Sequence, residues 1–334
     1  MGTEKKKELL IDLLKGVSRS FYLTLRVLPA TVRSQIGLAY LLARTSDTIA
    51  DTQLISVEQR LEALQGMRLH IAGTGEKPLD FGPLASDQSS TAERALLGKS
   101  NDLLEMMRTL EPADLELVQK VLAVVLSGQE LDLMRFAGAS DRHIVALRTD
   151  VELEDYTYRV AGCVGEFWTQ VCRRHLFPNA KLDDAWLLVQ SVRFGKGLQL
   201  VNILRDLPAD LRIGRCYLPE EKLRDTGLVP SKLLDPMNES LLRPLYNAYL
   251  EQAKEHLMAG WAYTNALPLF SIRARLACAW PILIGLQTLK LLRTGNMLDP
   301  GRRPKISRRD VKKWMWRSVL YYPWPGAWRG LAQR

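Results

Sequence analysis

Apolar side chains recur at spacings of three and four residues along most of the chain. The pattern is clearest in "QIGLAYLLARTSDTIA", "ELVQKVLAVVLSGQELDLMRF" and "AWLLVQSVRFGKGLQLVNILRDL". This spacing places the apolar residues on one face of an α-helix, whereas the period-two alternation that is typical of strands is nearly absent. The chain is therefore predicted to be an all-α protein.

Two segments interrupt the helical pattern. Residues 72–91 are dense in Gly, Pro and Ser and predict a loop, and residues 293–310 precede a basic, aromatic tail. No long linker and no repeat of fixed period divides the rest, so we predict one helical domain over residues 1–300 and a tail over 301–334. The apolar segment 276–292 contains Pro281 and Lys290 and is shorter than the roughly 20 residues of a membrane span, which predicts a buried helix.

Composition and charge limit the class of partner. With 334 residues, 47% of them hydrophobic, the chain can bury a large core, and its net charge of +9 favours anionic partners such as nucleic acid, a membrane surface or phosphorylated substrates. No nucleic-acid-binding motif accompanies the charge, so we expect no nucleic acid. The four scattered cysteines do not form the spacings of a disulfide framework or a zinc site. We expect a cytoplasmic protein that is a monomer or a weak dimer.

Two pairs of aspartates are the strongest chemical signal. Asp47 and Asp51 lie four residues apart in one apolar helical stretch; Asp206 and Asp210 do so in another, where Asn202 comes one turn earlier. Residues at i and i+4 share a helix face, so each set forms a polar stripe. Like charges held together in this way require a cation, and oxygen ligands without His or Cys favour Mg²⁺, which keeps coordination positions for phosphate oxygens.

A solvated helix face is the ordinary explanation for a single aspartate pair. Here both pairs lie in apolar sequence, and both are close to arginines that suit phosphate, namely Arg44, Arg205, Arg212 and Arg215. Together these features predict a diphosphate site. Pro208 stands between the second pair of acids and predicts that this helix ends or kinks there.

Four segments carry a resemblance to a known family. They are "GVSRSFYLTLRVLP", "LARTSDTIADT", "YTYRVAGCVGE" and "GLQLVNILRDLPADLRIGRCYLP". In this order and at these intervals, over about residues 10–295, the sequence resembles the squalene/phytoene synthase family of head-to-head prenyl transferases. The resemblance implies a single-domain isoprenoid synthase helical bundle with a central active-site cavity.

The resemblance also implies roles for individual residues. The ligands of Mg²⁺ would be Asp47, Asp51, Asn202, Asp206 and Asp210. The substrate diphosphates would be bound by Ser18, Arg19, Ser20, Arg44, Gln199, Asn202, Arg205 and Arg215. Tyr40 and Tyr158 complete the candidate catalytic set with the four aspartates; for Tyr40 an ordinary core position is the alternative.

Further positions could line the cavity. Asp132 matches an acid on a cavity-lining helix of the family, and Phe136, Phe167 and Trp168 could face the substrate, with a surface acid and plain core aromatics as the alternatives. The small residues of "VAGCVG" allow a helix to bend or leave room for a ligand; close helix packing is the alternative.

The subtype rests on two short features. "DTIAD" resembles the D-T-x-x-D of squalene synthases, and "RPKISRRDV" resembles their basic NADPH-binding segment, with Lys305 and Arg308 as candidates; a solvated or membrane-surface stretch is the alternative. This implies the conversion of two farnesyl diphosphates to squalene through presqualene diphosphate, with Mg²⁺ and NADPH. One residue departs from this resemblance. Animal and fungal squalene synthases have a tyrosine directly before Val-Ala-Gly, and this sequence has Arg159 at that position. It resembles instead the presqualene-diphosphate-forming type, and a dehydrosqualene or phytoene synthase without reductant is a further alternative.

The tail over residues 302–334 mixes Lys and Arg with Trp and Tyr. Trp and Tyr favour the headgroup level of a bilayer and basic residues favour anionic lipid. The tail therefore predicts peripheral contact with the inner face of a membrane; packing on its own helical bundle is the alternative.

Overall fold

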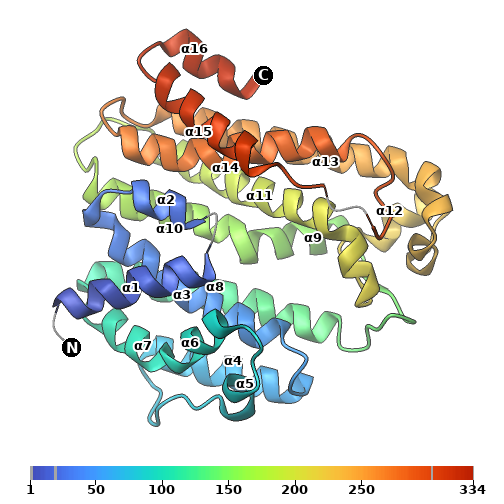
Figure 1. Ribbon diagram of the computed structural model, residues 1–334, viewed down its shortest axis with the longest axis horizontal. Helices are drawn as coiled ribbons and strands as arrows, with labels where there is room; N and C mark the ends of the chain where they lie inside the picture. Colours follow the sequence, from blue (N-terminus) through green and yellow to red (C-terminus); the bar gives the residue numbers. More distant parts are fainter. Residues whose placement is uncertain (1–2, 19–20, 302–303, 334) are drawn as a thin grey trace. The chain divides into compact units, whose positions relative to one another are not determined.

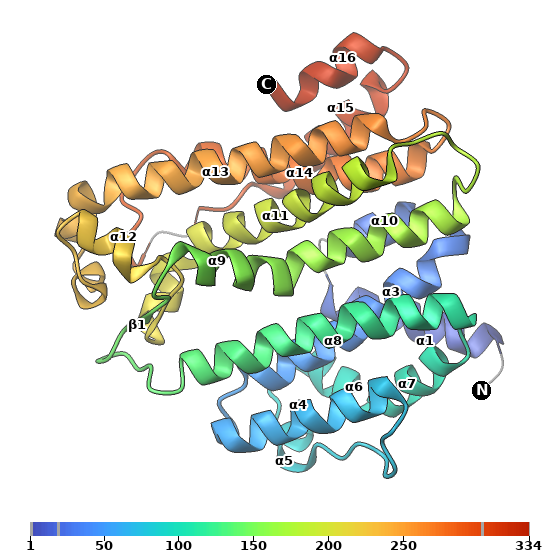
Figure 2. The same ribbon diagram turned by 180° about the vertical axis from the view of Figure 1, so that it is seen from behind.

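The computed structural model describes residues 3–18, 21–301 and 304–333. Helices dominate this part of the chain (Figures 1 and 2), and the all-α prediction is confirmed. The Cα positions divide the chain into two compact units. The first comprises Met1–Met134 and Phe167–Ala180, and the second comprises Arg135–Glu166 and Lys181–Arg334.

The first unit is organised around α3 (Ala30–Asp51), whose residues Ile36, Leu41 and Ile49 are buried. Helices α1, α4, α6 and α7 pack against it. The α3 helix therefore carries the first aspartate motif on a well-supported scaffold. The helices of this unit are α1 (Thr3–Val17), α2 (Phe21–Val27), α3, α4 (Val57–Ala72), α5 (Gly82–Ser86), α6 (Thr91–Gly98), α7 (Ser100–Arg108), α8 (Pro112–Arg135, with its last residue in the second unit) and the greater part of α10 (Cys163–His175).

Local sequence signals fix the ends of α4. Ser56 caps its start by accepting a hydrogen bond from the backbone N–H of Gln59, whose side chain in turn accepts one from the backbone N–H of Ser56. Gly73 ends it with φ of 84°, a left-handed conformation that glycine adopts without a steric cost. The predicted loop then follows, interrupted by the short helix α5.

The second unit is built on three long helices, α11 (Asp184–Arg212), α13 (Glu239–Ala266) and α14 (Ile272–Leu292), which lie side by side in both views (Figures 1 and 2). Two-residue strands β1 (Val145–Ala146) and β2 (Arg215–Cys216) pair in parallel, with Val145 opposite Arg215. This pairing holds the backbone of Arg215 just beyond the end of α11. The remaining elements are α9 (Asp150–Thr157), the π-helix η1 (Tyr158–Gly162), α12 (Glu220–Asp225), η2 (Pro230–Leu234), η3 (Pro236–Asn238), α15 (Arg308–Tyr321), α16 (Pro325–Arg329) and η4 (Gly330–Gln333).

Pro208 does not end α11, so of the two predicted effects, an end or a kink between the two acids, the end is wrong. The helix runs through Pro208 to Arg212. Proline has no N–H, so it leaves the carbonyl of Leu204, four residues earlier, without its usual helical donor. The hydroxyl of the fully buried Tyr246 on α13 donates to that carbonyl at 2.9 Å. Packing against α13 thus supplies the hydrogen bond that Pro208 removes.

The "VAGCVG" segment combines a π-helical turn with close packing. Residues Tyr158–Gly162 form a π-helical turn between α9 and α10. At Gly165 an added Cβ would overlap the backbone carbonyl of Ser191 on α11, and at Gly195 it would overlap the carbonyl of Ala161. The space at Gly165 is therefore filled by the backbone of a neighbouring helix, which favours the packing explanation at that position.

The apolar helix α14 is the one described helix long and apolar enough to cross a membrane by composition, but 67% of its apolar window is buried inside the protein. That burial agrees with a core helix. The tail packs against this unit: Trp280 Nε1 donates to Ser318 Oγ at 2.9 Å, and Trp328 Nε1 donates to Asn265 Oδ1 at 2.8 Å. The division at residue 300 stays a prediction, although α15 and α16 belong to the same unit as α11, α13 and α14.

Candidate functional site

The first aspartate motif occupies one helix. Tyr40, Arg44, Asp47 and Asp51 all lie on α3. The Arg44 guanidinium donates to the Asp47 carboxylate at 2.5 Å and to the Glu93 carboxylate on α6 at 2.5 Å. Arg44 thus bridges the motif to a helix about fifty residues further along the chain.

Ser18, which directly follows α1, lies beside Tyr40 and is buried. Burial raises the pKa of Tyr40, and the neighbouring Ser18 side chain and the charge of Arg44 partly oppose that rise. The structure therefore brings Ser18, Tyr40 and Arg44 together, and their roles in binding and catalysis stay predictions. Arg19 and Ser20, the other members of the N-terminal element, lie outside the described residues.

The charges on α3 are not fully compensated. Desolvation and the neighbouring charge of Asp51 together raise the pKa of Asp47 to about 6, against the opposing effect of Arg44. Asp47 is thus costly to ionise even though it is paired with Arg44, and an added cation would stabilise its ionised form. The Asp51 side chain, four residues later, is exposed.

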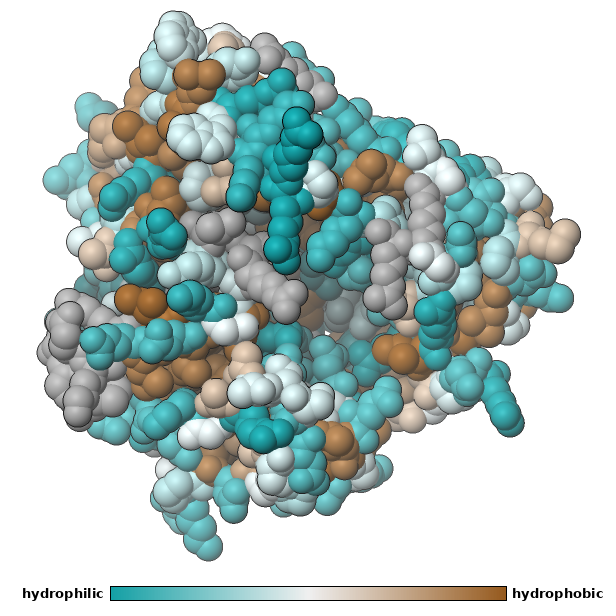
Figure 3. Space-filling view, in the orientation of Figure 1, coloured by the Kyte–Doolittle hydropathy of each residue, from teal (hydrophilic) through white to brown (hydrophobic). Residues whose placement is uncertain are grey.

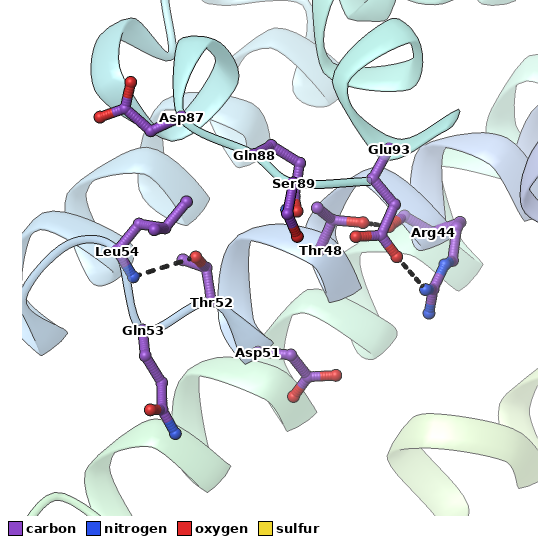
Figure 4. A pocket seen from close by; sticks show the side chains of 10 residues that line it. All are labelled: Arg44, Thr48, Asp51, Thr52, Gln53, Leu54, Asp87, Gln88, Ser89 and Glu93. Carbon is purple, nitrogen blue, oxygen red and sulfur yellow. Dashed lines mark hydrogen bonds and ion pairs between the residues drawn. The ribbon is translucent and has the colours of Figure 1, made fainter. Parts of the chain in front are cut away.

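A polar cavity of about 310 Å³ adjoins this motif within the first unit (Figure 4). One wall is the C-terminal end of α3, and the other is the segment that leads into α6. In Figure 4 the Glu93 carboxylate points at the Arg44 guanidinium, and Asp87 points away from the other side chains. The lining residues are Arg44, Thr48, Asp51, Thr52, Gln53, Leu54, Asp87, Gln88, Ser89 and Glu93.

The second aspartate motif lies on α11. Arg205 binds Asp206 through two hydrogen bonds, Nε to Oδ1 at 2.9 Å and Nη2 to Oδ2 at 2.5 Å. The hydrogen bond to Asp206 raises the pKa of Arg205, and the charge of Asp210 adds to this effect. Each aspartate motif therefore has an arginine bound to its first acid.

A chain of weak hydrogen bonds extends this motif. Asn202 Nδ2 donates to Gln199 Oε1 at 3.4 Å, and Gln199 Nε2 donates to the Tyr156 hydroxyl at 3.4 Å. The ring of Tyr156 stacks on that of Tyr217 with 4.7 Å between the ring centroids. The polar stripe of α11 thus reaches the start of the "YTYRVAGCVGE" segment.

Arg215 is held beside aromatic rings of the same unit. Its guanidinium lies 5.8 Å from the centroid of the Phe136 ring, and Phe136 packs edge-on against Tyr217. The attraction between the cation and the ring face helps to fix the position of the guanidinium.

The two tyrosines of "YTYRV" have different surroundings. The Tyr158 hydroxyl donates to Glu166 at 3.2 Å, whereas Tyr156 contacts Gln199. Burial raises the pKa of Tyr158, and the Glu166 charge adds to this rise. Arg159 binds Asp155 at 2.8 Å. Of the two tyrosines, Tyr156 is the one joined to the second aspartate motif, while Tyr158 stays a predicted catalytic residue.

The other predicted positions lie on separate elements. Asp132 on α8 and Phe167 on α10 are buried, and Trp168 is partly buried. Lys305 and Arg308 are exposed on either side of Ser307, whose hydroxyl caps α15 by accepting from the backbone N–H of Asp310 at 3.0 Å. The NADPH role of Lys305 and Arg308 stays a prediction.

The structure brings each motif together separately. Asp47 and Asp51 belong to the first unit, and Asp206 and Asp210 belong to the second. Within the described part of the chain, no three His, Cys, Asp or Glu side chains are grouped closely enough to hold an ion. The joint binding of Mg²⁺ by the two pairs stays a prediction.

Sequence reasoning missed two residues of these clusters. Glu93 lies in the first turn of α6, three residues after the N-cap Ser90, where an acid is common in any helix. Its hydrogen bond with Arg44 could therefore not be predicted from the sequence. Tyr156 lies in a recognised segment, but nothing in the spacing distinguishes it from Tyr158 as the partner of Gln199.

Comparisons with known proteins agree with these motifs. A family model described as squalene/phytoene synthase matches residues 14–310. The presqualene diphosphate synthase of Zymomonas mobilis is 30% identical over 246 residues, which are 73% of this chain and 72% of that protein. The bifunctional lycopene cyclase/phytoene synthase of Blakeslea trispora is 29% identical over 214 residues, 64% of this chain.

The match to the bifunctional relatives is partial. The chain spans 32% of the Blakeslea trispora protein and 49% of the corresponding protein of Phaeosphaeria nodorum. Among solved structures, TcSQS in complex with a ligand superposes with a TM-score of 0.76 at 22% identity, over 95% of this chain and 86% of that one. This likeness establishes the fold.

Proposed function

Because the chain belongs to the squalene/phytoene synthase family of head-to-head prenyl transferases, we propose that it condenses two farnesyl diphosphates and forms squalene. One observation carries the proposal. Each aspartate motif presents a carboxylate pair with an arginine on its first acid, Arg44 on Asp47 and Arg205 on Asp206. Two such clusters suit two diphosphate groups that must be bound and released.

The side chains fit the binding of Mg²⁺. The donor set consists of oxygens, and the pKa of Asp47 is raised by desolvation and by the charge of Asp51, both of which a divalent ion would offset. We propose as ligands Asp47, Asp51, Asn202, Asp206 and Asp210. The ions, when bound, would neutralise diphosphate charge and so favour departure of the leaving group.

The arginines and the buried hydroxyls would orient the substrates. Arg44 and Arg205 offer guanidinium groups already fixed by carboxylates, and Arg215 is positioned over the ring of Phe136. A planar guanidinium binds two phosphate oxygens at once, which fixes the orientation of the diphosphate. Ser18 and Tyr40 lie beside Arg44 and would complete the polar wall around the first diphosphate.

The reductive half of the reaction rests on the basic segment before α15. Lys305 and Arg308 are exposed cations suited to the phosphates of NADPH. We place the enzyme in the cytoplasm, with its tail in peripheral contact with the inner face of a membrane.

A second candidate function is the formation of presqualene diphosphate without further reduction. Arg159, in place of a tyrosine, is bound to Asp155, and the Tyr158 hydroxyl next to it is bound to Glu166. The relative from Zymomonas mobilis, which is 30% identical, is a presqualene diphosphate synthase. Both observations favour an enzyme that stops after the first half-reaction.

Product analysis separates these functions. The purified chain is incubated with farnesyl diphosphate and Mg²⁺, with and without NADPH. Squalene formed only with NADPH supports the proposal, and presqualene diphosphate in both reactions supports the second candidate. Dehydrosqualene without NADPH would refute both. If farnesyl diphosphate is not consumed, geranylgeranyl diphosphate is tested next.

Matched variants test the role of the aspartates. Asp51→Asn and Asp210→Asn are expected to lower turnover by roughly a hundredfold or more, because each removes a charge that holds the leaving group's counterions. Asp102→Asn, which changes an exposed acid paired with Lys99 on the surface, is the control and should keep full turnover. Full turnover by Asp51→Asn and Asp210→Asn would contradict the proposed Mg²⁺ site.

A further inference from the structure

An exposed apolar surface lies at the C-terminal end of the second unit. Its members are Trp316 and Leu320 on α15, Trp324 after α15, and Leu269 and Phe270 in the turn between α13 and α14; their exposed fractions are 74%, 59%, 58%, 68% and 74%. Five large apolar side chains at such exposure are unusual for a surface that meets only water. We call these five residues the apolar surface.

The two parts of the apolar surface are held together by specific contacts. The Tyr322 hydroxyl, just beyond α15, donates to the backbone carbonyl of Leu269 at 2.6 Å. The Arg275 guanidinium lies 5.3 Å from the centroid of the Tyr322 ring. In Figure 3 brown side chains gather at the upper left, where Figure 1 places α15 and the adjoining ends of α13 and α14. Segments nearly fifty residues apart thus present one face.

The opposite side of α15 is committed to the core. Trp314 and Ser318 are buried, and Ser318 accepts a hydrogen bond from Trp280 on α14. Trp316 follows Trp314 by two residues, a rotation of about 200° around the helix, so it points away from that contact. The helix cannot bury Trp316 by turning without losing its packing on α14.

Basic side chains adjoin the apolar residues on the same helix face. Arg309, Lys313, Trp316 and Leu320 follow one another at spacings of four, three and four residues, which place them on one side of α15. Lys312, also exposed, precedes Trp316 by one turn. The whole helix carries five Lys and Arg residues and a single Asp. Its outer face is therefore basic in the first half and apolar in the second.

We propose that the apolar surface and the basic half of α15 dock on an anionic lipid bilayer, with the α13–α14 turn inserted beside the tail. The inference deepens the membrane contact proposed above by naming the lipid class and the second segment. Trp side chains favour the bilayer interface, and Lys and Arg are attracted to anionic headgroups. The tail packs on its own bundle through one face and binds lipid through the other.

A second copy of the chain suits this surface less well. A two-fold contact pairs the same patch on both subunits, so the basic half of each α15 would face a basic surface. Like charges in such a contact oppose association, whereas an anionic bilayer supplies the opposite charge.

Vesicle flotation of the full chain, without substrate, tests the proposal. The probes are phosphatidylcholine vesicles with and without phosphatidylglycerol. We expect binding to the anionic vesicles that weakens as salt is added, and weak binding to phosphatidylcholine alone. The variant Lys312→Gln/Lys313→Gln should lower the partition coefficient roughly thirtyfold. Each cation contributes about 1 kcal/mol to binding an anionic surface, and about 1.4 kcal/mol corresponds to a tenfold change.

Variants of the apolar residues test the two segments separately. Trp316→Ser and Phe270→Ser should each lower partitioning by roughly tenfold, because each removes a large side chain from the interface. The matched controls are Trp186→Ser, a tryptophan 38% exposed on α11, and Lys120→Gln/Lys232→Gln, two exposed lysines on other elements. Both controls should bind like the parent chain, and thermal melting checks that every variant is folded.

Several results would overturn the inference. The parent chain could fail to float with anionic vesicles, or Trp316→Ser and Phe270→Ser could bind as the parent does. A dimer in sedimentation that Trp316→Ser dissolves, without vesicle binding by the parent, would assign the surface to a second copy. Because binding is measured without substrate, an inactive but vesicle-bound chain refutes the proposed function and leaves this inference standing.

Discussion

Removal of one buried hydroxyl should weaken the end of the helix that carries the second aspartate motif. Tyr246 on α13 is fully buried, and its hydroxyl donates to the Leu204 carbonyl on α11 at 2.9 Å. Pro208 cannot donate to that carbonyl, because it has no N–H. The substitution Tyr246→Phe therefore removes a donor that the helix itself does not replace.

The magnitude follows from the burial of the acceptor. A buried carbonyl left without a donor costs about 1–3 kcal/mol. Water cannot replace the lost hydroxyl, because the Tyr246 side chain has no exposed surface. Shape changes little, because phenylalanine keeps the ring. We expect Tyr246→Phe to lower the free energy of unfolding by about 2 kcal/mol. Since Pro208 lies between Asp206 and Asp210, the last turn of α11 should also hold its second acid less firmly.

A double-mutant cycle in urea isolates this hydrogen bond. In a Pro208→Ala background the new N–H can donate to Leu204, so Tyr246→Phe should cost at least about 1 kcal/mol less than in the parent chain. Tyr22→Phe, which removes the hydroxyl of a half-buried tyrosine in the first unit, is the control for hydroxyl loss. The reasoning is refuted if Tyr246→Phe costs the same in both backgrounds.

Three further substitutions test other parts of the structure. The pKa of Asp47 is raised from its ordinary value of 3.8 to about 6, so ionised Asp47 destabilises the fold above about pH 6, and this cost vanishes as the pH falls toward 3.8. Asp47→Asn should therefore melt at a higher temperature than the parent at about pH 8 without Mg²⁺, and a gain that persists at about pH 4 would contradict this. Asp114→Asn should lose about 2 kcal/mol in urea, because it removes the charge of a buried acceptor that is hydrogen-bonded to Gln35 and His175. Burial alone would raise the pKa of Asp114, but these hydrogen bonds lower it, so the parent should lose this contribution only in strongly acidic solution. Gly165→Ala should cost about 1–3 kcal/mol by overlap with the Ser191 backbone, whereas Gly98→Ala, with open space around its Cβ, should be neutral or stabilising in the same urea titration.

The carboxylate of Asp114 shows how a pair of contacts escapes sequence reasoning. It accepts hydrogen bonds from Gln35 on α3 at 2.8 Å and from His175 on α10 at 2.8 Å. These residues are separated by tens of positions, and each alone reads as an ordinary polar residue of a helix. Their pairing follows from which helix faces meet in the first unit.

Much of the local structure could be predicted from the sequence alone. The spacing of apolar residues predicted the helices, and the Asp-x-x-x-Asp spacing placed Asp47 with Asp51 on α3 and Asp206 with Asp210 on α11. The turn signals also placed the loop after α4. Such features depend on interactions within a few residues, since helical geometry is set by the chain's own repeat.

Tertiary structure decided what each motif contacts. Only packing showed that Glu93 shares Arg44 with Asp47, that Tyr156 is the tyrosine bonded to Gln199, and that α11 continues through Pro208 because Tyr246 supplies a donor. These contacts join residues about forty to fifty positions apart. Sequence spacing fixes the direction of a side chain around its own helix, whereas its partner is chosen by the helix that packs against that face.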